Sequence, residues 1–456
     1  MMQTLSAMKN INCLPSELVL HVLSYLDVQD DRKTLLSLCL TCQSMLVFTR
    51  PILYSDLSST SLPNDRLMYT LCQNELAWYL GQLVRKVGVA LPFGWLRQRT
   101  GGLYFDFQGQ ESVDVTQARR RDLEGQLARG KLQLRWHQTL PCLALLSALE
   151  ELDFSISGES EDQLDVMAER DIDGVFVIPS LAADLLDLPF LSTLKCLTLK
   201  RTHAPDYSFE PFGHLISAAP QLQKLSLTNI SPADLFEPIL DRLSHDANVT
   251  MALSEIVWEE GDAVEEGSWV EDFFVILAKL PTVHTFSMLC YSLSPSALDG
   301  YASQGIKMTA IKHASIRIVK SEREFLRRQP DWWLLTSRFF PNVERLRMTF
   351  TSNTQLPNRD ALPHLTDLTL EISGSESYHE VLRDFKLTSL ESLTYLTHLT
   401  IDHEADGWER YVEAWFAEGR NCFEEWTPYQ KQDTLQHVVI SYKDRRVVYG
   451  SDASRP

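Results

Sequence analysis

The chain has 456 residues, of which 44% are hydrophobic, so it can bury a substantial core and global disorder is excluded. Its formal net charge of −19 argues against a nucleic-acid partner, because phosphate binding needs clustered Lys and Arg. The first residues lack the apolar segment of a signal peptide, and no window of about 18 apolar residues follows. We therefore expect a cytoplasmic and/or nuclear protein with no membrane partner.

Eight cysteines are scattered along the chain, mostly inside apolar runs. This distribution favours buried thiols in a reducing compartment over disulfides. Cys39 and Cys42 form a C-x-x-C pair, but no second pair follows at the spacing of a zinc site. Because both fall within a leucine-rich helical pattern, we interpret them as packing residues, with metal or redox chemistry as the alternative.

Residues 14–54 carry the densest pattern of the chain. Pro15 suits the first turn of a helix. After a polar break at residues 27–33, two more helical runs follow, and we expect Pro51 to end the last one. Apolar residues recur every four positions on one face of the first helix, at Leu14, Leu18, Val22 and Leu26. A segment this short cannot bury an adequate core alone, so its surplus leucines predict a partner.

These residues carry a resemblance. The ordered set Leu14-Pro15-x-Glu17-Leu18, Leu35-Leu36-x-Leu38, Cys42 and Arg50-Pro51-x-Leu53-Tyr54 resembles an F-box motif, and its ending is similar to fungal members of that family. Gln43-Ser44-Met45 departs from the family, which often has two basic residues and Trp there, and the loop at residues 27–33 is longer than in compact members.

The resemblance implies docking onto the Skp-type adaptor of a cullin-based ubiquitin ligase, and through it onto a cullin scaffold. The adaptor-binding residues that it implies are Leu14, Pro15, Glu17, Leu18, Val22, Leu26, Leu35, Leu38, Cys42 and Leu53. The alternative is a three-helix cap on the following domain, in which the same leucines form an internal core.

An L-x-x-L-x-L pattern with variants recurs through the rest of the chain. From its second occurrence it starts at residues 194, 222, 253, 283, 311, 343, 365, 396 and 435, in steps of 28, 31, 30, 28, 32, 22, 31 and 39 residues. A near-constant step of about 30 residues is typical of stacked strand–helix units. Each triplet predicts a short strand. Prolines are expected to separate helix from strand at Pro220, Pro281, Pro341 and Pro363.

Amphipathic helices are predicted between these strands. One such helix places Trp269, Phe273, Leu277 and Leu280 on one face, and another does so with Trp408, Val412, Trp415 and Phe416. Upstream of the array, Val84, Val87 and Val89 are compatible with a first strand.

This array resembles the irregular leucine-rich repeats of F-box receptors. The ninth position of the repeat, which holds Asn or Cys in that family, holds Thr202, Ile230, Thr351, Ser373 and Glu404, so we expect no ladder of buried asparagines. The predicted fold is α/β: a three-helix module followed by an irregular leucine-rich-repeat solenoid of short parallel strands and helices. An unrelated α/β domain with the same period is the alternative.

Four regions are predicted. They are a docking module at 12–56, a linker with one or more first repeats at 57–140, the repeat domain at 141–442 and a polar tail at 443–456.

Motifs for catalysis are missing from the sequence. The stretch 125–131 approaches a phosphate loop, but Leu132 stands where Ser or Thr would hold magnesium. His398 and His403 lie near acidic residues, yet alternation along a strand separates odd from even positions. We therefore expect no enzyme, no cofactor and no metal site. The acidic run at 259–266 is interpreted as a solvated loop. The basic run at 119–135 is interpreted as a solvated helix face or a patch for an acidic partner.

The likeliest recognition surface is the inner face of the strands, which repeat proteins use for binding. Arg345 and Arg347 are two apart on one strand, so together they suit a carboxylate or a phosphate. Candidate target-binding residues on this face are Arg317, Arg345, Arg347, Asp367, Glu371, His398 and Asp402. The alternative is that these residues form the solvated face of a sheet.

The sequence thus predicts a substrate-recognition subunit of a Skp-cullin-F-box type ubiquitin ligase, acting in ubiquitin-dependent degradation of an unknown target protein. A leucine-rich-repeat scaffold unrelated to ubiquitylation is the main alternative, and an enzyme with an unrecognised site is a third.

Overall fold

A computed structural model describes residues 15–62, 65–68, 70–71, 76–92, 136–157, 181–202, 209–245, 251–260, 269–290, 305–318, 338–350, 362–372, 398–403, 437–442 and 445–450. The chain folds as two compact units, Met1–Leu222 and Gln223–Pro456.

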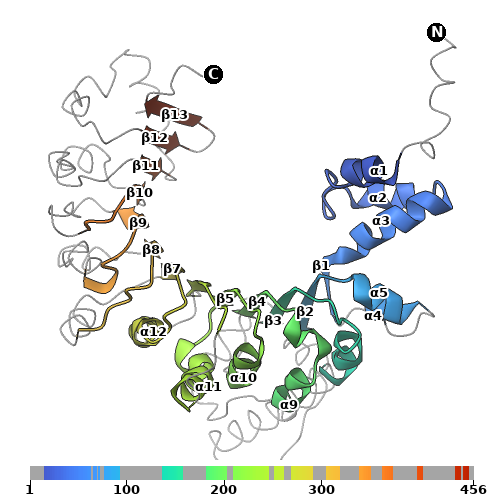
Figure 1. Cartoon of the computed structure of the whole chain (residues 1–456), viewed down its shortest axis with the longest axis horizontal. Coiled ribbons are helices and arrows are strands. Elements are labelled where there is room, and N and C mark those ends of the chain that lie inside the picture. The colour runs from blue at the N-terminus through green and yellow to red at the C-terminus, as the bar shows by residue number, and fades with distance from the viewer. Residues whose placement is uncertain are drawn as a thin grey trace, which may run out of the picture. The chain divides into compact units, whose positions relative to one another are not determined.

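The first unit begins with three helices, α1 (Ser16–Leu23), α2 (Arg32–Cys39) and α3 (Gln43–Ser55), as the sequence predicts (Figure 1). Val19 and Leu23 of α1 and Met45 of α3 are buried together at the centre of this module. The partly buried side chains packed against them are Leu26, Leu38, Cys42, Phe48 and Ile52. The module therefore has a small apolar core of its own.

The prediction that Pro51 ends the third helix is wrong, because α3 continues to Ser55. Proline removes one helical N–H and one hydrogen bond, but packing can hold the helix across it. Here Thr49 and Leu53, on either side of Pro51, are both buried. The Thr49 hydroxyl also donates to the carbonyl of Met45 at 2.6 Å.

The first unit continues with a sheet whose neighbouring strands are parallel and follow chain order from β1 to β4. Its strands are β1 (Asp56–Leu62), β2 (Lys86–Pro92), β3 (Glu151–Ser157) and β4 (Cys196–Thr202). The helices among its described residues are α4 (Asp65–Met68), α5 (Ala77–Leu83), a helix at 136–143, α9 (Leu181–Leu186), the 3₁₀ helix η5 (Pro189–Ser192) and α10 (Glu210–Ala218). The predicted strand around Val87 and Val89 is β2, and β1 lies at the start of the stretch predicted to hold a linker and the first repeats.

In the second unit the strands from β5 to β12 also follow chain order, and each is parallel to the next. They are β5 (Lys224–Thr228), β6 (Glu255–Glu259), β7 (Thr285–Cys290), β8 (His313–Ile318), β9 (Arg345–Phe350), β10 (Asp367–Ile372), β11 (His398–His403) and β12 (His437–Tyr442). The described helices of this unit include α11 (Pro232–His245) and α12 (Trp269–Ala278). Each strand covers the last two apolar positions of a predicted repeat, so the strand predictions are confirmed.

The end of the chain differs from the prediction. Within the stretch predicted as a loose tail, β13 (Arg445–Gly450) pairs antiparallel with β12. Its Val-Val-Tyr sequence favours a strand, although the flanking residues are polar.

Successive side chains along the strands of the second unit point to opposite faces of the sheet. Alternate residues such as Leu225, Leu227, Ile256 and Trp258 are buried, and α11 and α12 lie on one side of β5–β7 (Figure 1). In α12, Phe273 and Leu277 are buried with Leu280 just beyond it, which confirms the predicted face at these three positions. Aromatic rings link the layers, since Phe273 lies 5.5 Å from both Trp258 and Phe286, measured between ring centroids.

A short polar row closes this core at the ends of three strands. Register pairs Thr228 with Glu259 and Glu259 with Leu289. The residues that follow each of these, Asn229, Glu260 and Cys290, are all buried. The Asn229 N–H donates to the Glu259 carbonyl at 2.7 Å, and the Glu260 N–H donates to the Leu289 carbonyl at 2.8 Å. These residues occupy the eighth position of the repeat, one before the position at which the sequence was searched for asparagine.

Glu260 corrects a further expectation. The acidic run from Glu259 was interpreted as a solvated loop, yet Glu260 is 5% exposed. Burial, and then the charge of Glu260, raise the pKa of the Cys290 thiol.

The cysteines are mixed in state. Cys39, Cys42, Cys196 and Cys290 are thiols, as expected. Cys142 is disulfide-bonded, so the expectation of thiols is wrong at that position.

Candidate docking surfaces

The first helix of the module has two apolar faces. Val19 and Leu23 point into the module, and Leu18 and Val22 are 50% and 60% exposed. Pro15 and Glu17 at the start of the helix are also exposed. Spacing of three or four residues places each pair on one face. Leu18 and Val22 therefore do not serve as the internal core that a simple cap would require.

The other two helices also expose large apolar side chains. Outside the predicted set, the large apolar side chains exposed in the described part of the module are Leu20, Tyr25, Leu36, Leu40 and Val47. Leu40, in the turn between α2 and α3, is 88% exposed. Many large apolar side chains exposed on one small module are typical of a protein interaction site. Sequence periodicity missed these residues because they are interspersed with the core positions.

The remaining predicted docking residues lie deeper. Leu26, Leu38 and Cys42 are partly buried against the module core. Leu35 and Leu53 are buried, so in this structure they build the module and offer no surface to a partner. Leu14 lies outside the described residues.

Two cysteines organise the turn from α2 to α3. Sγ of Cys39 and Oγ1 of Thr49 share a hydrogen bond at 2.9 Å. Cys42 is the N-cap residue of α3, and its Sγ accepts from the Met45 N–H at 3.5 Å. Both side chains are partly buried.

The module is joined to the sheet without a linker, because α3 ends at Ser55 and β1 begins at Asp56. The Arg85 N–H donates to the Ser55 carbonyl at 2.8 Å. Burial raises the pKa of Asp56, but hydrogen bonds from Ser58 and Gln29 and the charge of Lys86 outweigh it, so the net pKa is lowered. The pKa of Lys86 is raised, because the neighbouring Glu151, Asp153 and Asp56 outweigh its desolvation.

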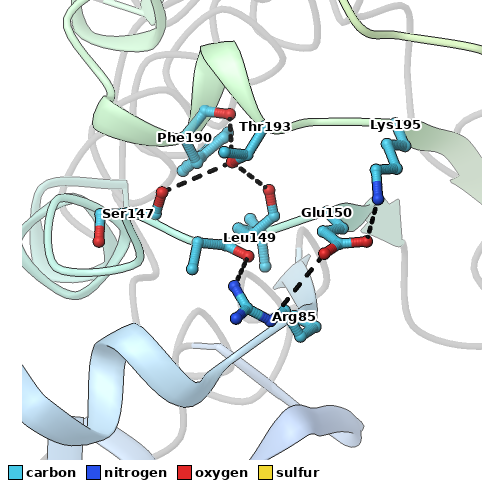
Figure 2. Close-up of polar contacts among 8 residues, drawn as sticks. Arg85, Ser147, Leu149, Glu150, Phe190, Thr193 and Lys195 are labelled. Carbon is cyan, nitrogen blue, oxygen red and sulfur yellow. Dashed lines mark hydrogen bonds and ion pairs between the residues drawn. The ribbon is translucent and has the colours of Figure 1, made fainter.

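Alternating charges cross the exposed face where the strands begin. Glu150, just before β3, lies 3.9 Å from Arg85 and 2.7 Å from Lys195, as Figure 2 shows. Arg85 also donates to the carbonyl of Ala148 at 2.8 Å. In the second unit the same arrangement joins Lys224 to Glu255 at 2.7 Å. Such exposed pairs each stabilise the fold only weakly.

The candidate target-binding face contains the same kind of pair. Arg345 Nε lies 3.6 Å from the carboxylate of Asp367, and Lys312 lies 2.9 Å from Glu344. The Lys312 hydrogen bond holds the pKa of Glu344 below its usual value. Arg345 therefore already has a carboxylate partner, which weakens the predicted clamp of Arg345 and Arg347.

Register places the other candidates in rows. Asp367 lies beside His398, and Glu371 lies beside Asp402. Arg347 is exposed and Arg317 is partly exposed, both at alternate positions from the buried residues of their strands. Of Glu371, His398 and Asp402 the structure describes the backbone alone. The phosphate-loop-like stretch, the basic run and the helix containing Trp408 lie outside the described residues.

Among the residues that the structure describes, no three His, Cys, Asp or Glu side chains form a group that could hold a metal ion. Within the same residues, no helix is both long enough and apolar enough to cross a bilayer.

Comparison with known proteins identifies one part of the chain. Residues 11–59 match the F-box-like family model, so the N-terminal module is an F-box-like domain. No curated protein matches the chain. Among solved structures, a chain from the crystal structure of the Rad7 and Elc1 complex in yeast is similar, at 13% identity and a TM-score of 0.23, over 57% of this chain and 72% of that one. A structural similarity this low does not indicate a function.

Proposed function

We propose that this protein is a non-catalytic substrate receptor of a Skp-cullin-F-box type ubiquitin ligase, working in the cytoplasm and/or nucleus. The F-box-like domain holds the adaptor, and the strand face of the repeat-like sheet holds a target protein. The receptor acts by raising the effective concentration of the target near the ubiquitin donor.

One observation carries the proposal. The F-box-like domain has a core of its own and still presents large apolar side chains on each of its three helices. Exposing Leu18, Val22 and Leu40 to water is unfavourable by about 25 cal/mol per Å² of apolar surface, and a partner that covers them recovers this free energy.

Co-expression with a Skp-type adaptor, followed by size-exclusion chromatography, tests the proposal. The expected result is a one-to-one complex that is lost when Leu18 and Val22 are both changed to Asp. Leu186→Asp is the matched control, because Leu186 is an exposed leucine of α9 outside the module. A folded wild-type chain that elutes separately from the adaptor contradicts the proposal.

A second candidate is a scaffold whose N-terminal helices cap the sheet. The direct junction of Ser55 and Asp56 favours it, because α3 leads straight into the first strand. In that case Leu18→Asp with Val22→Asp leaves every interaction of the protein unchanged, since both side chains already face solvent.

A further inference from the structure

The turn that joins α2 and α3 holds two thiols at its ends. Cys39 is the last residue of α2, Cys42 caps α3, and the chain turns at Leu40 and Thr41 between them. A four-residue turn brings its ends within about 7 Å, a range that overlaps the Cα separation of disulfides. Both thiols are partly exposed, so a small oxidant can reach them.

Neither sulfur is the best choice for the structural task that it performs. Ser, Thr, Asp or Asn is preferred at a helix N-cap, and sulfur is a weak acceptor. Cys42 nevertheless caps the 13-residue helix α3, at a distance of 3.5 Å. Cys39 shares its hydrogen bond with Thr49, which is a polar residue buried inside the module. Packing alone does not require a thiol at either position.

We infer that Cys39 and Cys42 form a reversible disulfide site that responds to a thiol oxidant of the oxidised-glutathione class. Each cysteine loses its S–H bond, and one S–S bond forms between the two sulfurs. The two protons and two electrons pass to oxidised glutathione, whose own S–S bond breaks to give two glutathione thiols. A reduced dithiol reverses the step.

Oxidation changes the module at three places. Cys39 leaves Thr49, Cys42 stops accepting from the Met45 N–H, and the turn that displays Leu40 is drawn together. The first turn of α3 thus loses its cap. If the proposed function holds, oxidation also weakens docking of the adaptor, because Leu40 is the most exposed apolar side chain in the described part of the module.

The test uses the full chain, reduced or treated with oxidised glutathione. Mass spectrometry after alkylation is expected to find Cys39 and Cys42 joined in one peptide in the oxidised sample and alkylated in the reduced one. Hydrogen exchange at the amides of Met45 and Leu46 is expected to be about fivefold faster after oxidation, the factor that corresponds to loss of a helix cap.

Cys42→Ser is the decisive variant, because serine is itself a good N-cap and the module keeps its fold. It is expected to show the same slow exchange with and without oxidant, and Cys196→Ser serves as a control that retains the response. Finding both cysteines still alkylatable after oxidation overturns the inference, as does a disulfide that leaves exchange unchanged. Adaptor binding is measured separately. A reduced chain that does not bind the adaptor contradicts the proposed function, whereas the exchange result alone decides whether the disulfide site exists.

Discussion

Gly81 is a position where a single methyl group has a large effect. A Cβ atom there would lie 2.6 Å from the carbonyl oxygen of Leu145, which is backbone and cannot rotate away. We expect Gly81→Ala to lower the free energy of unfolding by about 1–3 kcal/mol, as overpacking does. Chemical denaturation followed by circular dichroism measures it. The neighbouring exposed Gln82, changed to Ala, is expected to stay within about 0.5 kcal/mol of the wild type.

Asp56 gives the junction of module and sheet a dependence on pH. Its pKa in the folded state is lowered from the usual 3.8. The stabilisation is therefore complete above that value and is lost as the pH falls through the lower folded-state pKa. Because the carboxylate is partly exposed, we expect a contribution of about 0.5 kcal/mol or less. Carboxylates titrate roughly between pH 5 and pH 3. Over this range Asp56→Asn is predicted to lose less stability than the wild type, as measured by thermal unfolding at each pH. Equal losses in the variant and the wild type would refute this role.

At the scale of elements, Thr193 connects η5 to the turn before β3. Its hydroxyl lies 2.8 Å from the Leu149 carbonyl and 3.0 Å from the Phe190 carbonyl (Figure 2). Thr193→Val keeps the shape and removes the donor, so we expect a loss of about 1 kcal/mol. Urea unfolding measures the loss, with Thr198→Val on the partly exposed face of β4 as the control. An unchanged midpoint would show that solvent satisfies these carbonyls equally well.

The elements themselves were largely predictable from the sequence, because apolar triplets such as Leu222, Leu225 and Leu227 recur at a near-constant step. The last two positions of each triplet alternate as in a strand. Other features were not. The apolar period of α1 fits either Leu18 and Val22 or Val19 and Leu23 as the inward face, and packing against Met45 decides it. The strand β1 has almost no apolar alternation in its sequence Asp-Leu-Ser-Ser-Thr-Ser-Leu and depends on pairing with β2.

The candidate sites were predictable in part, for the same physical reason. A sequence motif locates a docking segment, but which residues face outward depends on tertiary packing, so Leu35 and Leu53 were predicted to bind the adaptor although both side chains are buried. Arg345 was predicted as part of an anion clamp, because the sequence does not show that Asp367 lies across from it on the next strand.

At the scale of the whole molecule, the absence of a linker after α3 makes the F-box-like domain depend on the sheet beside it. A flexible four-residue insertion between Ser55 and Asp56 breaks the continuity and displaces the Ser55 carbonyl from the Arg85 N–H. A module of roughly 40 residues is marginal alone. We therefore expect amide exchange in α1–α3 to become about tenfold faster, with β5–β10 unchanged. The same insertion after Gly450 is the control, and equal protection of α1–α3 in both chains would show that the module is self-sufficient.

The paired strands of the second unit have a consequence for how such a chain can change in length. From β5 to β12, each strand pairs with its neighbour without a slipped residue, so every strand presents the same edge to the strand on either side. Duplicating or deleting one complete repeat, from the start of one of these strands to the start of the next, leaves strand edges that can still pair. The number of repeats can therefore change without disrupting the sheet. The reversed strand β13 ends this equivalence. A repeat added within the series meets parallel strands on both sides, whereas one added after β13 meets a reversed strand.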